Sequence, residues 1–118
     1  MDKITIWHNA RCSKSRKTLV LIEDHGFEPE VVRYLETPPG LADLECVIRL
    51  LDCGPRDILR TKEVAYTELN LAAENDEQKL KQAMVENPVL IERPIVVRGD
   101  RAVIGRPPEN VLPLLEKS

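Results

Sequence analysis

Residues 4–16 of this 118-residue chain are Ile4-Thr5-Ile6-Trp7-His8-Asn9-Ala10-Arg11-Cys12-Ser13-Lys14-Ser15-Arg16. The alternating apolar run before His8 is typical of a short buried strand. The stretch from Ser13 to His25 has helical spacing and is followed by Gly26, a common helix terminator. Cys12 is therefore predicted where a strand gives way to a helix. Its sulfur would lie near the unpaired N–H groups and the positive dipole end of that helix.

The residues around Cys12 favour the thiolate form of its side chain. Arg11, Lys14 and Arg16 are cations in the same segment, and His8 adds another charge if it is protonated. A free cysteine has a pKa near ~8.5, and such surroundings lower it to roughly 3.5–7.5. A buried structural cysteine is the alternative interpretation. Such a thiol is not usually found among several cation-capable residues at a loop-to-helix junction, so we interpret Cys12 as reactive.

The composition predicts one domain with an aliphatic core. A chain of 118 residues matches the usual size of a single core, and it has only one Phe, one Trp and two Tyr. The net charge of -3 argues against nonspecific nucleic-acid binding. No run approaches the ~20 apolar residues of a membrane span, and the early first strand leaves no room for a signal peptide. Three cysteines do not form a disulfide framework, which favours the cytoplasm.

The rest of the pattern mixes strands and helices. Strands are expected at 3–7, 30–34, 94–98 and 101–104, and helices at 13–25, 41–53 before Gly54, 55–60, 64–69, 77–86 after Asp76 as N-cap, and beyond Pro108. An initial parallel pair with a right-handed crossover and a final antiparallel hairpin give a mixed four-stranded sheet flanked by helices. The sequence therefore predicts an α/β, thioredoxin-like fold. We expect a single domain over 1–118 with a helical insertion at about 41–88.

Three arginines outside the Cys12 loop are singled out by position. Arg60 ends a short helical piece, Arg93 precedes Pro94 at a strand start, and Arg106 follows the last strand. The planar fork of arginine binds tetrahedral oxyanions in a bidentate way. A solvated surface arginine is the alternative for each of them. The Arg93–Pro94 bond is a candidate cis peptide, because a proline is tolerated at a strand start.

Other chemistries match the sequence less well. A tyrosine-phosphatase loop needs Cys-x5-Arg, whereas Arg16 gives Cys-x3-Arg, and a dithiol oxidoreductase needs a cysteine where Ser15 stands. Two histidines and three scattered cysteines show no zinc-ligand spacing, and neither phosphate-binding glycine fingerprint is present. We therefore expect no metal site and no bound cofactor. Cys46 and Cys53 are interpreted as packing residues.

Six segments carry a family resemblance along the whole chain. They are Ile4-Thr5-Ile6-Trp7-His8-Asn9 through Cys12, Ser15 and Arg16; Tyr34-Leu35-Glu36-Thr37-Pro38-Pro39; Leu59-Arg60; Asn87-Pro88; Glu92-Arg93-Pro94-Ile95-Val96-Val97; and Gly105-Arg106-Pro107. In this order they resemble the glutaredoxin-coupled, ArsC-like arsenate reductase family. Ser13-Lys14 after the cysteine and the short C-terminal region are similar to its shorter chromosomal subgroup.

The resemblance implies an oxidoreductase that reduces arsenate to arsenite in arsenic detoxification. The site residues that it implies are Cys12, His8, Ser15, Arg60, Arg93 and Arg106. Cys12 is expected to be the nucleophile and His8 to lower its pKa, while the arginines and Ser15 bind the substrate. Glutathione serves as a co-substrate and glutaredoxin as the partner that resolves the mixed intermediate. We expect a cytoplasmic monomer with no nucleic-acid or membrane partner.

Two other classes of function stay open at this point. A glutathione-dependent thiol or disulfide reductase would use Cys12 without needing all three arginines. A noncatalytic Spx-like regulator that binds RNA polymerase would share the fold. Such regulators often carry Cys-x-x-Cys as a redox switch, and Ser15 argues against that.

Overall fold

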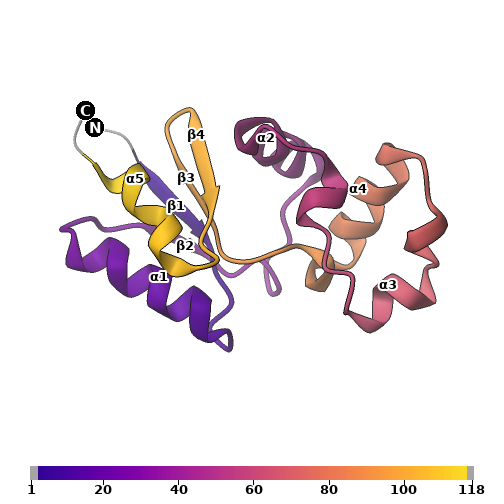
Figure 1. Cartoon of the computed structure of the whole chain (residues 1–118), viewed down its shortest axis with the longest axis horizontal. Helices are drawn as coiled ribbons and strands as arrows, with labels where there is room; N and C mark the ends of the chain where they lie inside the picture. The colour runs from indigo at the N-terminus through magenta and orange to yellow at the C-terminus, as the bar shows by residue number, and fades with distance from the viewer. Residues whose placement is uncertain (1–2, 117–118) are drawn as a thin grey trace. The chain divides into compact units, whose positions relative to one another are not determined.

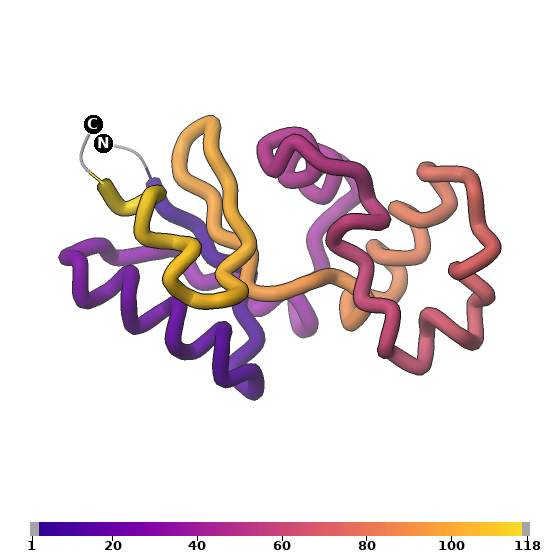
Figure 2. The backbone as a smooth tube through the Cα atoms, viewed as in Figure 1, coloured from indigo at the N-terminus to yellow at the C-terminus, as the bar shows by residue number. Residues whose placement is uncertain are grey.

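The computed structural model describes residues 3–116, which divide into two compact units. The first unit combines the chain up to Thr37 with the chain from Arg93 onward, and the second unit is Pro38–Glu92. The colours of Figure 2 show that the indigo start and the yellow end of the chain belong to the same unit. The helical insertion expected at about 41–88 lies inside the second unit. The single-domain organisation stays a prediction.

The first unit is built on a mixed four-stranded sheet (Figure 1). Its strands are β1 (Ile4–Trp7), β2 (Glu30–Val32), β3 (Ile95–Arg98) and β4 (Arg101–Ile104), in the order β2-β1-β3-β4. β1 pairs with β2 in parallel, and the β1–β3 and β3–β4 pairs are antiparallel. This arrangement confirms the predicted α/β, thioredoxin-like fold and the hairpin, whose turn contains Gly99 at a φ of 59°.

Three helical elements pack on one face of this sheet. They are α1 (Ser13–Asp24), η4 (Pro108–Val111) and α5 (Leu112–Leu115), and Figure 1 shows α1 and α5 on the same side. The buried cluster that joins them to β1 and β3 consists of Ile4, Ile6, Ile22, Val96, Val111, Leu114 and Leu115. Its members are aliphatic, as the composition led us to expect. Helix α1 therefore lies fixed against the sheet, with its N-terminus at the end of β1.

The second unit is helical. It contains α2 (Leu41–Leu51), η1 (Pro55–Ile58), α3 (Val64–Glu68), η2 (Leu71–Ala73), α4 (Glu77–Glu86) and η3 (Pro88–Leu90). The Asp76 side chain accepts a hydrogen bond of 2.9 Å from the N–H of Gln78, which confirms the expected N-cap of α4. None of the helices described between residues 3 and 116 has the length and apolar character needed to cross a membrane.

Some element boundaries differ from the sequence-based expectation. Helix α2 ends at Leu51 rather than at Gly54, because Asp52 adopts the left-handed conformation with a φ of 56°. Aspartate is one of the few non-glycine residues that tolerate this region. The strand expected to reach Tyr34 ends at Val32. The last helix is divided into a 3-10 turn and a short α-helix, and the 3-10 turn η2 was not expected.

Helix α1 offers a matched test of this core. Ile22 is 0% exposed and Val20 is 52% exposed on the same helix. Ile22→Ala should lower the free energy of unfolding by about 2–5 kcal/mol, because it removes buried methylene groups and leaves a cavity. Val20→Ala should change it by about 0.5 kcal/mol or less. Urea unfolding followed by circular dichroism measures both, and equal losses would contradict the described packing.

Candidate active site

A short hydrogen-bonded loop carries Cys12 from β1 into α1. The N–H of Cys12 donates to the carbonyl of Asn9 at 3.0 Å, and the Asn9 side-chain oxygen accepts from the N–H of Arg11 at 3.0 Å. Nη1 of Arg16 donates to the carbonyl of Ala10 at 2.8 Å, which ties the loop to the first turn of the helix. Arg16 therefore helps to hold the loop in place.

Cys12 is a free, half-buried thiol at the N-cap of α1. Its burial by itself raises the pKa of the thiol, since the charged form loses solvation. The backbone N–H of Ser15 and a hydrogen bond from the Arg93 side chain oppose this effect, followed by the N–H of Lys14 and the charge of Arg93. Together these groups hold the pKa of Cys12 below its ordinary value. The helix N-terminus thus stabilises a thiolate, as predicted.

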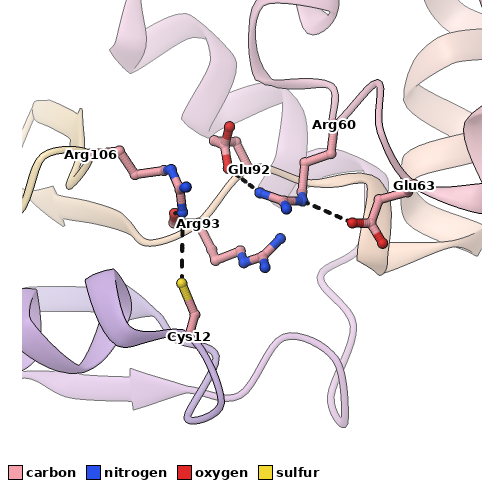
Figure 3. Close-up of polar contacts among 6 residues, drawn as sticks. All are labelled: Cys12, Arg60, Glu63, Glu92, Arg93 and Arg106. Atoms are coloured by element: carbon pink, nitrogen blue, oxygen red, sulfur yellow. Dashed lines mark hydrogen bonds and ion pairs between the residues drawn. The ribbon is translucent and has the colours of Figure 1, made fainter.

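Arg106 and Arg93 come together with Cys12 in the first unit. Nη1 of Arg106 lies 3.7 Å from Sγ of Cys12 and donates to the carbonyl of Arg93 at 3.4 Å. Figure 3 shows the Cys12 sulfur pointing toward the guanidinium of Arg106. The Arg93–Pro94 bond is cis, as expected, and the Arg106–Pro107 bond is cis as well. The site therefore combines a thiolate with two guanidinium groups.

A close contact between Gly105 and α1 holds Arg106 in position. The N–H of Gly105 donates to the carbonyl of Pro94 at 2.9 Å. A Cβ atom at residue 105 would lie 2.6 Å from Oγ1 of Thr18 and 2.9 Å from Cγ of Pro94, so no side chain fits there. Oγ1 of Thr18 lies 2.8 Å from the Lys14 carbonyl and 3.3 Å from that of Gly105. Neither Gly105 nor Thr18 was predicted from the sequence to be a positioning residue, although a glycine just before Arg106 was a usable signal.

His8 acts at this site as a neutral, buried side chain. It is 6% exposed, and its Nδ1 lies 2.7 Å from Oγ of Ser15, which also accepts from the N–H of Asn9 at 3.1 Å. Burial lowers the pKa of His8, and the charges of Arg33 and Arg16 lower it further. The protonated form of His8, which the sequence suggested as a further positive charge near Cys12, is therefore disfavoured. His8 reaches Cys12 indirectly, through Ser15 and the helix start.

Ser15 is fully buried. Its hydroxyl is engaged by His8 and by the loop backbone, whereas its N–H group favours the Cys12 thiolate. The side chain of Ser15 thus supports the loop. A direct role of Ser15 in substrate binding stays a prediction, and its backbone N–H is the group able to fill that role.

Arg60 lies in the second unit and is held there by two carboxylates. Its Nε is 3.3 Å from Glu63 and its Nη1 is 2.6 Å from Glu92, and the Arg60 side chain is 18% exposed (Figure 3). The Arg60 N–H also donates to the carbonyl of Leu90 at 2.8 Å. These ion pairs reduce the net positive charge that Arg60 offers to an anion. Its role in oxyanion binding stays a prediction.

The other two cysteines differ from Cys12. Cys46 lies within α2 and Cys53 follows that helix, and both are free and half-buried. Burial raises the pKa of Cys53, and the nearby carboxylates of Asp57 and Asp52 raise it further. Within residues 3–116, no group of His, Cys, Asp or Glu is arranged to hold a metal ion.

Comparison with known proteins assigns the class to which this fold and site correspond. The chain belongs to the ArsC family, whose model matches residues 7–114. It is 52% identical over 115 residues to the uncharacterized protein YfgD of Escherichia coli K12, which covers 96% of this chain and 97% of that protein. It is 44% identical over 113 residues to an arsenate reductase of Neisseria meningitidis serogroup B, covering 94% and 97%. The solved structure of an arsenate reductase from Vibrio cholerae matches with a TM-score of 0.91 and 46% identity, covering 95% and 97%.

The ionisation of Cys12 is directly measurable. We expect the alkylation rate of Cys12, followed by mass spectrometry against pH, to have a midpoint below the value of about 8.5 of a free thiol. Arg93→Ala should raise this midpoint, because it removes a hydrogen bond and a charge that favour the thiolate. Arg101→Ala, which changes an exposed arginine of β4, is the control. A wild-type midpoint at or above the free-thiol value would refute this account.

Proposed function

We propose that this protein reduces arsenate to arsenite, with Cys12 as nucleophile and with glutathione and glutaredoxin as the source of electrons. The observation that carries the proposal is the Cys12 sulfur, whose pKa is lowered and which lies 3.7 Å from Arg106. This pairing suits an anionic substrate with an electrophilic centre. Membership of the ArsC family, with relatives named arsenate reductases, supports arsenate as that substrate.

The site arginines perform two tasks in this proposal. Arg93 and Arg106 neutralise the arsenate oxygens and turn the arsenic atom toward the sulfur. Preorganised donors of this kind stabilise charge that develops in the transition state. The family resemblance adds Arg60 as a third oxyanion-binding arginine. Because Arg60 is paired with Glu63 and Glu92, arsenate must compete with these carboxylates for it.

The covalent steps follow from thiol chemistry. The Cys12 thiolate attacks arsenic(V), and one arsenate oxygen leaves as water after taking up protons. The thiol of glutathione replaces a second oxygen, which also leaves as water. A glutaredoxin thiol then attacks the glutathione sulfur, so that a disulfide forms and the electron pair of the As–S bond stays on arsenic. The remaining Cys12–arsenic(III) bond is cleaved by water, which releases arsenite and the Cys12 thiol.

The second thiol of this cycle has to come from outside the chain. Position 15 is a serine, and burial with two nearby carboxylates raises the pKa of Cys53, which makes it a poor nucleophile. Glutathione is abundant in the reducing cytoplasm, where free cysteines persist. The proposal therefore places a monomeric enzyme there, with glutathione as co-substrate and no bound cofactor.

One observation favours a second candidate, a glutathione-dependent thiol reductase. Such an enzyme needs the Cys12 thiolate but not three arginines free to bind an oxyanion, and Arg60 is already paired with Glu63 and Glu92. No comparable observation favours the Spx-like regulator.

The arginine variants separate these candidates. In a coupled assay with arsenate, glutathione, glutathione reductase and glutaredoxin, NADPH oxidation reports turnover. Arg93→Ala and Arg106→Ala should each lower kcat/KM for arsenate about 100-fold or more, because one preorganised donor is worth roughly 2.7–4 kcal/mol. Arg93→Lys should also lose much activity, since it keeps the charge but not the fork.

Arg101→Ala serves as the control and should retain turnover. If the Arg93, Arg106 and Arg60 alanine variants all kept near-normal arsenate turnover, the oxyanion role would be wrong. A wild-type protein that reduces glutathionylated substrates but not arsenate would make the thiol-reductase candidate the better one.

The cysteine variants test the single-thiol mechanism. The Cys46→Ser, Cys53→Ser double variant should keep glutathione-dependent activity within about twofold, because surface or half-buried substitutions away from the chemistry are usually mild. Cys12→Ser should have no activity in the same assay. Loss of turnover in the folded double variant, or efficient turnover with thioredoxin alone, would contradict the mechanism.

A further inference from the structure

A surface cavity begins beside Cys12 and runs along helix α1. One wall is the helix surface, and the other is the segment that follows Arg106. The residues that line it are Ser13, Lys14, Arg16, Lys17, Val20, Leu21, Pro107, Pro108 and Glu109. Its volume of about 790 Å³ falls within the roughly 300–1,000 Å³ typical of small-molecule sites. The mechanism derived above uses none of these side chains as a ligand.

Both walls of this cavity start one residue away from the active site. The helix wall begins at Ser13, one residue after Cys12, and the opposite wall begins at Pro107, one residue after Arg106. Nη1 of Arg106 lies 3.7 Å from the Cys12 sulfur. The cavity is therefore next to the residues at which an incoming thiol would react.

The charges of the cavity are asymmetric. Lys14, Arg16 and Lys17 are exposed cations on the helix wall, and Glu109 is an exposed anion on the opposite wall. Val20 is 52% exposed and adds apolar surface to the helix wall. Glutathione carries two carboxylates, one ammonium group and an apolar stretch of backbone. Its charge pattern is complementary to that of the cavity.

The helix face that lines the cavity is long enough for either arm of glutathione. From Ser13 to Leu21 the helix rises by about 12 Å, at ~1.5 Å per residue. Three residues of extended chain span about 10–11 Å. The thiol of glutathione is on its central residue, so with the sulfur near Cys12 each of its two arms is shorter than this helix face.

We propose that this cavity is the glutathione subsite, in which Lys14 and Lys17 bind the carboxylates of glutathione and Glu109 binds its ammonium group. The proposal rests on glutathione being the co-substrate in the function proposed above. The cavity would fix where glutathione binds, and the steps of arsenate reduction would be unchanged.

A thiol exchange assay tests the subsite without arsenate. The Cys46→Ser, Cys53→Ser protein is first labelled at Cys12 as a mixed disulfide with 5-thio-2-nitrobenzoate. A thiolate then attacks the Cys12 sulfur, forms a new disulfide and releases the coloured thiolate, with no net oxidation. The rate is measured with reduced glutathione, with its dialkyl ester, which lacks the carboxylates, and with 2-mercaptoethanol.

Lys17→Glu is the test variant and Lys79→Glu, an exposed helical position of the second unit, is the matched control. We expect Lys17→Glu to slow glutathione by about three- to tenfold, from one exposed attraction lost and one repulsion gained. The ester and 2-mercaptoethanol should react at unchanged rates, and Lys79→Glu should change none of the three. This comparison isolates the interaction between Lys17 and the carboxylates.

Three results would overturn the subsite. The first is an equal effect of Lys17→Glu and Lys79→Glu on glutathione. The second is an equal slowing of the ester, which would locate the effect in Cys12 reactivity. The third is unchanged exchange with glutathione but slower coupled turnover with glutaredoxin, which would assign the cavity to a protein partner. A wild-type protein with the expected exchange pattern but no arsenate reduction would instead count against the proposed function alone.

Discussion

The close approach of Gly105 to helix α1 is the constraint on which the active-site geometry depends. Residue 105 has space for a hydrogen atom but not for a methyl group, because Thr18 and Pro94 occupy the positions next to its Cα. Arg106 is the next residue, so the position of its backbone beside Cys12 is fixed by this contact. Forcing extra volume into a packed contact usually costs about 1–3 kcal/mol. A side chain at residue 105 would therefore displace the backbone that carries Arg106. Main-chain packing at Gly105 therefore helps to place the Arg106 guanidinium, together with its contacts to Cys12 and Arg93.

Opposing effects act on the pKa of the Cys12 thiol. Burial raises the pKa of its thiol more than any single other group changes it, yet the summed effect of the N–H groups and Arg93 is larger. One pKa unit corresponds to about 1.36 kcal/mol, so a few directed hydrogen bonds are sufficient to reverse the burial effect. Groups fixed by the backbone lose little entropy when the thiolate forms. The pKa of this half-buried thiol is therefore lowered without a protonated histidine beside it.

Much of the fold could be predicted because local patterns and tertiary packing agree. Three local predictions were confirmed: a strand from the alternating residues of β1, the end of α1 just before Gly26, and the N-cap of α4 at Asp76. The Leu51 helix end was missed because aspartate rarely adopts a positive φ, and sequence alone favoured Gly54.

At the site, Cys12 was singled out from its neighbours in sequence, and Arg106 from its position after the last strand together with the family resemblance. The neutral state of His8 was not predicted, because its burial and its proximity to Arg33 exist only in the folded chain. The ion pairs of Arg60 with Glu63 and Glu92 depend in the same way on the folded second unit.

The serine at position 15 has a consequence for how the protein responds to oxidation. In the first turn of α1, a second thiol at this position could close a disulfide with Cys12 and store an oxidised state within one molecule. A buried hydroxyl bonded to His8 and the loop has no such chemistry. An oxidised Cys12 therefore cannot form an intramolecular disulfide with residue 15. Reduction of Cys12 requires a thiol from another molecule. The concentration of external thiols, rather than the fold, therefore sets the rate at which the Cys12 thiol is regenerated.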